Sequence, residues 1–212
     1  MKAIILAARG ITNLPPNIDL KTNLSWILRS MKEAGVDDIY IVGGKRIEDI
    51  SSSHDGIKII YNNRWKNTGP LESLLLYEKI LSQSDTIISF ADTIYTKEVI
   101  PNFISNLSDS PLQIISDSSW INRYSRTPES INKAEKIYSR KGNVFRATRD
   151  TINILDDSAE YTGICFIRKS FVRKKMSFWL KPSMSNKARI YTRGEIAHNL
   201  FATSIADFKP SS

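Results

Sequence analysis

The chain opens with residues 1–8, MKAIILAA, in which Ala3 to Ala7 form a short continuous apolar run. A strand that is covered on both faces has this composition, whereas a strand with one solvent-exposed face alternates apolar and polar residues. Gly10 follows soon after the run and marks a turn. The opening therefore predicts a central strand whose carboxyl end leads into a glycine-containing loop.

Strand-like and helix-like segments alternate outward from this first strand as far as residue 120. Further strands are expected at 39–42, 57–61, 86–91 and 112–116, and helices at 24–34, 70–80 and 96–107. Gly35 suits the end of the first helix and Pro70 the first turn of the second. Such alternation with short connections indicates an α/β fold of βαβ units, with a Rossmann-like, open and mostly parallel sheet and helices on both faces.

The pattern changes between residues 137 and 167, where strand-like runs at 144–145, 152–154 and 163–167 follow one another without helices. We interpret them as a small antiparallel appendage on the open sheet, followed by helices at 170–180 and 194–205. No internal repeat or low-complexity linker divides the sequence, so residues 1–212 are expected to form a single domain.

The net charge of +8 is concentrated in the second part of the chain. Residues 121–212 hold 18 Lys and Arg against 8 Asp and Glu, whereas residues 1–120 hold 12 against 14. A positive field of this kind attracts phosphates, nucleic acids or anionic lipid head groups. The alternative is that these side chains only solubilise an exposed surface.

Composition excludes two kinds of protein. No apolar run approaches the roughly 20 residues needed to cross a bilayer, so an integral membrane protein is not expected. Cys165 is the single cysteine, which excludes an internal disulfide and a cysteine-cluster zinc site. We expect a cytoplasmic protein.

Polar residues follow three of the expected strands at the point where each strand ends. They are the Ala8–Gly10 turn, Asp92 after the strand at 86–91, and Asp117 after the strand at 112–116. Open parallel sheets bind ligands beyond the carboxyl ends of their strands, where the strand order reverses. The sequence therefore predicts a ligand site at this edge of the sheet.

A further set of motifs follows the opening strand in a fixed order. They are Glu33–Ile39 (EAGVDDI), Tyr61 with Asn62, Trp65, Thr68 with Gly69 and Pro70, Ser73 with Leu74, Ile88–Tyr95 (ISFADTIY), Asp117 with Trp120, Arg123 and Arg126, Ala134–Lys136, and Glu160–Gly163. In this order the chain resembles the sugar-phosphate nucleotidyltransferases, whose fold is the NTP-transferase or GT-A type. It is most similar to the branch of phosphocholine and 2-aminoethylphosphonate cytidylyltransferases, and the resemblance covers residues 1–180 approximately.

The resemblance implies a Mg²⁺-dependent reaction. In it, a phosphate or phosphonate oxygen of an acceptor attacks the α-phosphorus of a nucleoside triphosphate and releases pyrophosphate. CTP is the favoured nucleotide, and the acceptor is a small phosphorylated or phosphonylated amine, alcohol or sugar. Residues 1–118 would form the nucleotide-binding half and residues 119–212 the acceptor-binding half. The resemblance implies no membrane insertion, and it leaves open whether the protein forms a homodimer.

The same resemblance assigns the site residues. Asp92 would bind the metal and, with Lys21 and Arg9, serve catalysis. The nucleotide would contact Leu6, Ala7, Ala8, Gly10, Thr68, Gly69 and Ser73. The acceptor pocket would consist of Asp117, Trp120, Arg123, Arg126, Glu135 and Glu160, with the Trp120 ring facing a cationic head group and the arginines the acceptor phosphate. Structural alternatives stay open: N-capping for Asp92 and Thr68, a plain turn for Gly10, and surface ion pairs for the charged acceptor residues.

The sequence departs from the family at two places. The first loop is shorter than the family's glycine-rich turn, so Arg9 and Lys21 would replace its usual arginine and lysine. Late in the chain, Asp207 matches the family's second metal-binding aspartate poorly. Both departures favour, as the alternative, a catalytically degenerate relative that binds a nucleotide. Nucleic-acid binding through the basic second part ranks third, and a dinucleotide-binding dehydrogenase, which needs a Gly-x-Gly-x-x-Gly turn, ranks fourth.

Overall fold

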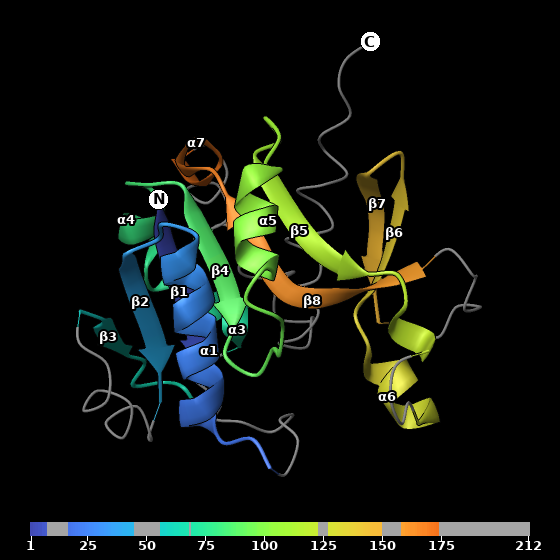
Figure 1. Cartoon of the computed structure of the whole chain (residues 1–212), viewed down its shortest axis with the longest axis horizontal. Helices are drawn as coiled ribbons and strands as arrows, with labels where there is room; N and C mark the ends of the chain where they lie inside the picture. Colours follow the sequence, from blue (N-terminus) through green and yellow to red (C-terminus); the bar gives the residue numbers. More distant parts are fainter. Residues whose placement is uncertain (8–16, 45–55, 68, 123–126, 150–157, 174–212) are drawn as a thin grey trace, which may run out of the picture. The chain divides into compact units, whose positions relative to one another are not determined.

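The computed structural model describes residues 1–7, 17–44, 56–67, 69–122, 127–149 and 158–173 (Figure 1). Contacts divide the chain into two compact units, one formed by Met1–Gln113 with the segment that begins at Gly163, and the other by Ile114–Thr162. The first unit contains the strands β1 (Lys2–Ala7), β2 (Asp38–Gly43), β3 (Lys58–Tyr61) and β4 (Thr86–Phe90), and the end of β8 (Ser158–Ile167). Its helices are α1 (Leu20–Glu33), α3 (Pro70–Leu75), α4 (Glu78–Leu81), α5 (Val99–Ser105) and α7 (Lys169–Phe171).

The sheet of the first unit has the strand order β3-β2-β1-β4-β8. The first four strands are parallel, and β8 is antiparallel to β4. β1 is the central strand, and its residues Ala3, Ile4 and Ile5 are fully buried. The prediction of a buried first strand in an open, mostly parallel sheet is therefore confirmed.

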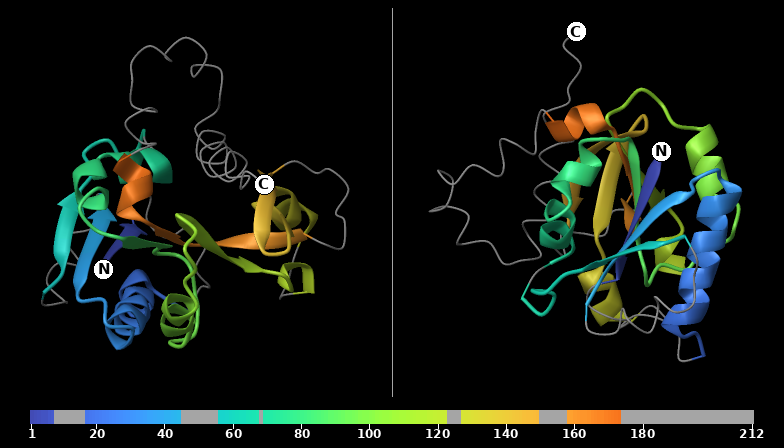
Figure 2. Two further views of the ribbon diagram at one scale, coloured as in Figure 1. Left: turned by 90° about the horizontal axis from the view of Figure 1, so that it is seen from above. Right: turned by 90° about the vertical axis from the view of Figure 1, so that its left-hand side faces the viewer.

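Helices cover both faces of this sheet. Figure 2 shows α1 and α5 on one face, and α3, α4 and α7 on the other. α1 begins one turn before the expected residue 24, because the Asp19 side chain accepts a hydrogen bond from the Thr22 amide at 2.7 Å and caps the helix. The same hydrogen bond lowers the pKa of the Asp19 carboxyl. The helix ends before Gly35, whose φ is +74°.

Two helices are shorter than the sequence predicts. The expected helix at 70–80 is divided into α3 and α4, and at the break the Tyr77 amide donates to the Leu74 carbonyl, three residues back instead of four. The helix expected at 96–107 is limited to α5. The strand at 152–154, the helix at 194–205 and the helix at 170–180 beyond residue 173 lie outside the described residues. No helix in the described part of the chain is long and apolar enough to cross a membrane.

The second unit is built on antiparallel strands. It contains β6 (Lys136–Arg140), β7 (Asn143–Thr148), the first half of β8 and the end of β5 (Leu112–Asp117), with the short helices η1 (Trp120–Asn122) and α6 (Pro128–Lys133). β6 pairs antiparallel with both β7 and β8. The antiparallel appendage is therefore confirmed, and β6 is a strand that the sequence analysis did not single out. β5 pairs with β8, so it does not extend the parallel row as the sequence suggested.

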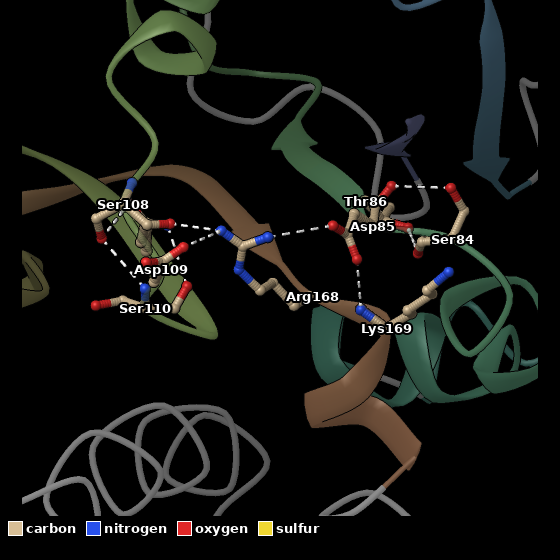
Figure 3. Close-up of polar contacts among 9 residues, drawn as sticks. Ser84, Asp85, Thr86, Ser108, Asp109, Ser110, Arg168 and Lys169 are labelled. Atoms are coloured by element: carbon tan, nitrogen blue, oxygen red, sulfur yellow. Dashed lines mark hydrogen bonds and ion pairs between the residues drawn. The ribbon is translucent and has the colours of Figure 1, made fainter. Parts of the chain in front are cut away.

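Arg168 joins three segments of the first unit at the amino end of β4 (Figure 3). Its guanidinium lies 3.5 Å from the Asp85 carboxylate and 3.8 Å from that of Asp109, and it donates to the Ser108 carbonyl at 2.6 Å. Asp85 also accepts a hydrogen bond from the Lys169 amide at 2.9 Å. Arg168 is therefore a structural residue at the opposite end of β4 from the predicted ligand site.

Tyr95, in the segment between β4 and α5, provides a test of side-chain burial. Its burial raises the pKa of the phenol to about 12. The unfolded chain loses this proton near pH 10, so the contribution of Tyr95 to stability is lost as the pH rises from about 10 to about 12. We expect Tyr95→Phe to remove that loss, a difference on the order of 2 kcal/mol. Urea unfolding at the two ends of this range measures it, and equal pH dependence in both proteins would contradict the prediction.

Candidate functional site

The strand order reverses between β1 and β4. The chain leaves β1 for β2 and β3 on one side, and returns to β4 on the other side of β1. A ligand binds beyond the carboxyl ends of the strands at such a reversal. Leu6 pairs in register with Phe90, Ala7 ends β1, and Asp92 follows β4 by two residues. The structure thus brings Leu6, Ala7 and Asp92 to the same edge of the sheet, as the sequence predicts.

Contacts from three elements hold the loop Ala91–Thr93, which we call the Asp92 loop. The Ala91 amide donates to the Leu6 carbonyl of β1 at 3.0 Å. The Asn23 side-chain amide of α1 donates to the carbonyls of Ala91 and Thr93, at 2.7 and 3.2 Å. Gly163 of β8 leaves no room for a side chain, because a Cβ there would lie 2.8 Å from the Phe90 ring and 3.0 Å from Thr93 Oγ1. The position of this loop is therefore set by β1, α1 and β8 together.

Lys21 lies in the first turn of α1 with its side chain exposed. It is two residues from Asn23, and helix positions two apart lie on different sides of the helix. Lys21 therefore belongs to the helix end that contacts the Asp92 loop, on a different side from Asn23. Six other predicted site residues lie outside the described residues: Ala8, Arg9, Gly10, Thr68, Arg123 and Arg126.

Gly69 and Ser73 lie at the start of α3, on the same edge of the sheet. The Ser73 amide donates to the Gly69 carbonyl at 3.0 Å, and the buried Ser73 hydroxyl accepts a hydrogen bond from Asn62 Nδ2 at 3.0 Å. The Asn62 amide in turn donates to the carbonyl of Gly43, the last residue of β2, at 2.9 Å. These hydrogen bonds tie the start of α3 to the carboxyl ends of β2 and β3.

The four described residues of the predicted acceptor pocket all belong to the second unit. Asp117 ends β5 and accepts a hydrogen bond from the Ser119 amide at 2.9 Å. Glu135 forms an ion pair with Arg149. Glu160 lies on β8 directly opposite Lys136 on β6. The fourth residue, Trp120, is fully buried.

Trp120 and Lys136 form the centre of the second unit. The Trp120 indole N–H donates to the Ser158 carbonyl at 2.9 Å. The fully buried Lys136 ammonium lies 6.0 Å from the centroid of the Trp120 ring and donates to the carbonyls of Ala134 and Arg149, at 3.3 and 3.4 Å. The cation over this ring in the structure is thus a lysine of the chain itself. Sequence analysis missed Lys136 as a site candidate, because a lysine at a strand end is normally exposed.

Asp92, the predicted metal-binding carboxylate, lies two residues after β4 at the reversal of strand order. In the described ranges, no three His, Cys, Asp or Glu side chains lie together as a metal site. Mg²⁺ does not need such a cluster, because it retains several waters and binds one or two carboxylates together with substrate phosphates. A single carboxylate at Asp92 therefore fits Mg²⁺ that arrives with a polyphosphate.

Comparison with solved structures identifies the fold of the chain. No protein-family model and no curated protein sequence matches the chain. The solved structure of the inositol-1-phosphate CTP transferase from T. maritima matches with a TM-score of 0.60 and 16% identity, over 85% of this chain and 76% of that one. A glucose-1-phosphate thymidylyltransferase from Bacillus anthracis, solved in complex with sucrose, matches with a TM-score of 0.62 and 18% identity, over 88% and 78%. The chain therefore has the NTP-transferase fold that the sequence resemblance implied.

Gly163→Ala tests whether β8 fixes the Asp92 loop. The new Cβ would meet the Phe90 ring at 2.8 Å, on a residue whose φ is +83°, so we expect a loss of about 2–3 kcal/mol of stability from overlap and backbone strain together. Gly35→Ala is the matched control, because Gly35 has a φ of +74° and nothing within 4 Å of its added Cβ. Gly35→Ala should lose only the stability that backbone strain at a positive φ removes, about 1 kcal/mol. Equal losses in urea unfolding would contradict a close approach at Gly163.

Proposed function

We propose that the chain is a Mg²⁺-dependent nucleotidyltransferase. It transfers a nucleoside monophosphate, CMP from CTP in the first instance, to a small phosphorylated or phosphonylated acceptor and releases pyrophosphate. The observation that carries the proposal is the Asp92 carboxylate beyond β4, beside β1, in a fold shared with two solved nucleotidyltransferases. The choice of CTP is supported by the ordered motifs, which resemble those of cytidylyltransferases that act on phosphocholine and 2-aminoethylphosphonate.

The reaction requires two anionic groups to meet. An acceptor oxygen forms a bond to the α-phosphorus, and the bond from that phosphorus to the bridging oxygen breaks, so that its electron pair leaves with pyrophosphate. Positioning and charge neutralisation supply most of the catalysis in such a transfer. Mg²⁺, when bound, neutralises phosphate oxygens and aligns the reacting groups. Asp92 holds it, and Lys21 and Arg9 supply positive charge to the triphosphate.

The nucleoside binds at the carboxyl edge of the parallel strands. Leu6 and Ala7 offer a half-buried apolar surface to the base at the end of β1. Gly69 and Ser73 border the same edge, and the hydrogen bond from Asn62 to Ser73 holds the start of α3 in place. This arrangement supports a preformed nucleotide site, in which little conformational freedom is lost on binding.

The second unit binds the acceptor in this proposal. Asp117 and Glu160 are partly exposed carboxylates that suit an amine or quaternary ammonium head group. Arg123 and Arg126 suit its phosphate or phosphonate, since a guanidinium donates two parallel hydrogen bonds to such an oxyanion. Trp120 is fully buried with the Lys136 ammonium over its ring, so the proposal gives it no contact with the acceptor.

A nucleotide-binding relative without turnover is the alternative. The short loop between Ala8 and Lys21 favours it, because fewer backbone amides are available to a triphosphate than in the family that the chain resembles. This alternative predicts that CTP binds with the same residues but that no pyrophosphate appears.

Asp92→Ala tests the proposed reaction. We expect wild-type protein with Mg²⁺ and CTP to release pyrophosphate in the presence of phosphocholine, 2-aminoethylphosphonate or a sugar 1-phosphate. Loss of the metal-binding carboxylate should lower kcat at least about a hundredfold. Asp37→Ala is the control, because it removes the same charge from an exposed position at the amino end of β2.

A coupled pyrophosphate assay measures the rate, and calorimetry measures CTP binding in parallel. CTP binding without pyrophosphate release, with every acceptor tried, would favour the non-catalytic alternative. Neither binding nor release, with any of the four common nucleoside triphosphates, would overturn the proposal.

A further inference from the structure

The buried face of α1 contains two polar residues among its apolar ones. Leu24, Ile27, Leu28 and Met31 form the apolar stripe, and Asn23 and Ser30 are buried beside it, with exposed fractions of 2% and 0%. Buried polar side chains are costly unless they form hydrogen bonds. Both residues do so, and both donate to the segment between β4 and α5: Ser30 Oγ donates to the Lys97 carbonyl at 2.7 Å, and Asn23 donates to the Asp92 loop.

Asn23 contacts the backbone on both sides of Asp92. Its Nδ2 group carries two hydrogens, and these reach the Ala91 carbonyl at 2.7 Å and the Thr93 carbonyl at 3.2 Å. The first carbonyl belongs to the peptide group that precedes Asp92, and the second belongs to the peptide group that follows Thr93, so one side-chain nitrogen bridges the two ends of the Asp92–Thr93 dipeptide. The peptide group between Asp92 and Thr93 is held within this bridge, because the Thr93 amide donates to the Phe90 carbonyl at 3.4 Å. With the peptide planes before and after Asp92 held in this way, the direction of the Asp92 Cα–Cβ bond is also held, and with it the region that the carboxylate can reach.

The identity of the side chain matters for this arrangement. A carboxamide has the two donors that two carbonyls require, and a hydroxyl has one. Leucine has nearly the shape of asparagine but no donor, so it would leave both carbonyls without this partner. Carbonyls freed in this way would turn toward water or other donors, and the backbone around Asp92 would gain conformational freedom.

We propose that Asn23 is the positioning residue for the Asp92 carboxylate, and that it sets the affinity of the site for a divalent cation. The inference rests on the proposed function, because it takes Asp92 as the metal-binding residue. Outer-sphere residues that orient a metal ligand change metal affinity by about 10- to 100-fold when replaced, which is the size of the effect expected here.

Ser30 provides the matched control. It lies two turns further along the same helix, is equally buried, and holds the same segment at Lys97, five residues after Asp92. Ser30→Ala therefore removes a comparable hydrogen bond without touching the peptides that flank Asp92. A role for Asn23 that is only structural would give the two variants the same phenotype.

The experiment compares wild type, Asn23→Leu, Asn23→Ala, Ser30→Ala and Asp92→Ala. Mn²⁺ binding in the presence of CTP is measured by electron paramagnetic resonance, and hydrogen exchange is measured on the peptide that contains residues 91–95. Both Asn23 variants should weaken Mn²⁺ binding at least about tenfold and speed exchange of this peptide about tenfold. Ser30→Ala should bind Mn²⁺ within about twofold of wild type. Asn23→Ala serves where the bulkier leucine prevents folding, and circular dichroism checks the fold of each variant.

The outcomes separate the inference from the function on which it rests. Wild-type Mn²⁺ affinity in folded Asn23 variants, with binding lost in Asp92→Ala, would overturn the role of Asn23 and leave the proposed function standing. Equal weakening by Ser30→Ala and the Asn23 variants would reduce Asn23 to a structural residue. Absence of Mn²⁺ binding by wild type with CTP would overturn the proposed function, and the inference with it.

Discussion

The hydrogen bond from the Ala91 amide to the Leu6 carbonyl, 3.0 Å long, continues the pairing of β1 with β4 one residue past the end of β4. It determines how far the chain remains in the sheet before it turns, and therefore where Asp92 lies relative to β1. Since all four parallel strands end at the same edge, this register also places Asp92 at that edge, next to the end of β1. The site depends on this backbone register before it depends on any side chain.

Buried side-chain amides take over where the backbone leaves the sheet. A carbonyl that has left its strand still needs a hydrogen-bond partner if it is buried. Asn23 supplies donors to the Asp92 loop, and Asn62, itself bonded to Gly43, supplies one to Ser73. Both asparagines are almost fully buried, at 2% and 1% exposed. Hydrogen bonds from buried side chains therefore hold the Asp92 loop and the start of α3 at the carboxyl edge, which suits a site that must hold charged groups in fixed positions.

Most of the first unit could be predicted because its strands are short, buried apolar runs, and β1 to β4 lie within a residue or two of the expected ranges. The break between α3 and α4 could not be predicted, because the helical spacing of apolar residues continues through Leu76 and Tyr77 although the helix itself is interrupted there. β6 was missed because its first residue is Lys136, which the fold buries against Trp120. The contact of Asn23 with Ala91 spans 68 residues of sequence, and a polar residue in an apolar stripe does not reveal such a partner.

The central claim is that Asp92 binds a divalent cation together with a nucleoside triphosphate. Anomalous diffraction from crystals soaked in Mn²⁺ and CTP tests it most directly. We expect an anomalous peak about 2.0–2.3 Å from an Asp92 carboxylate oxygen, with the triphosphate lying beside it at the carboxyl ends of β1 and β4. Crystals in which CTP is visible but no anomalous signal lies beside Asp92 would contradict the account.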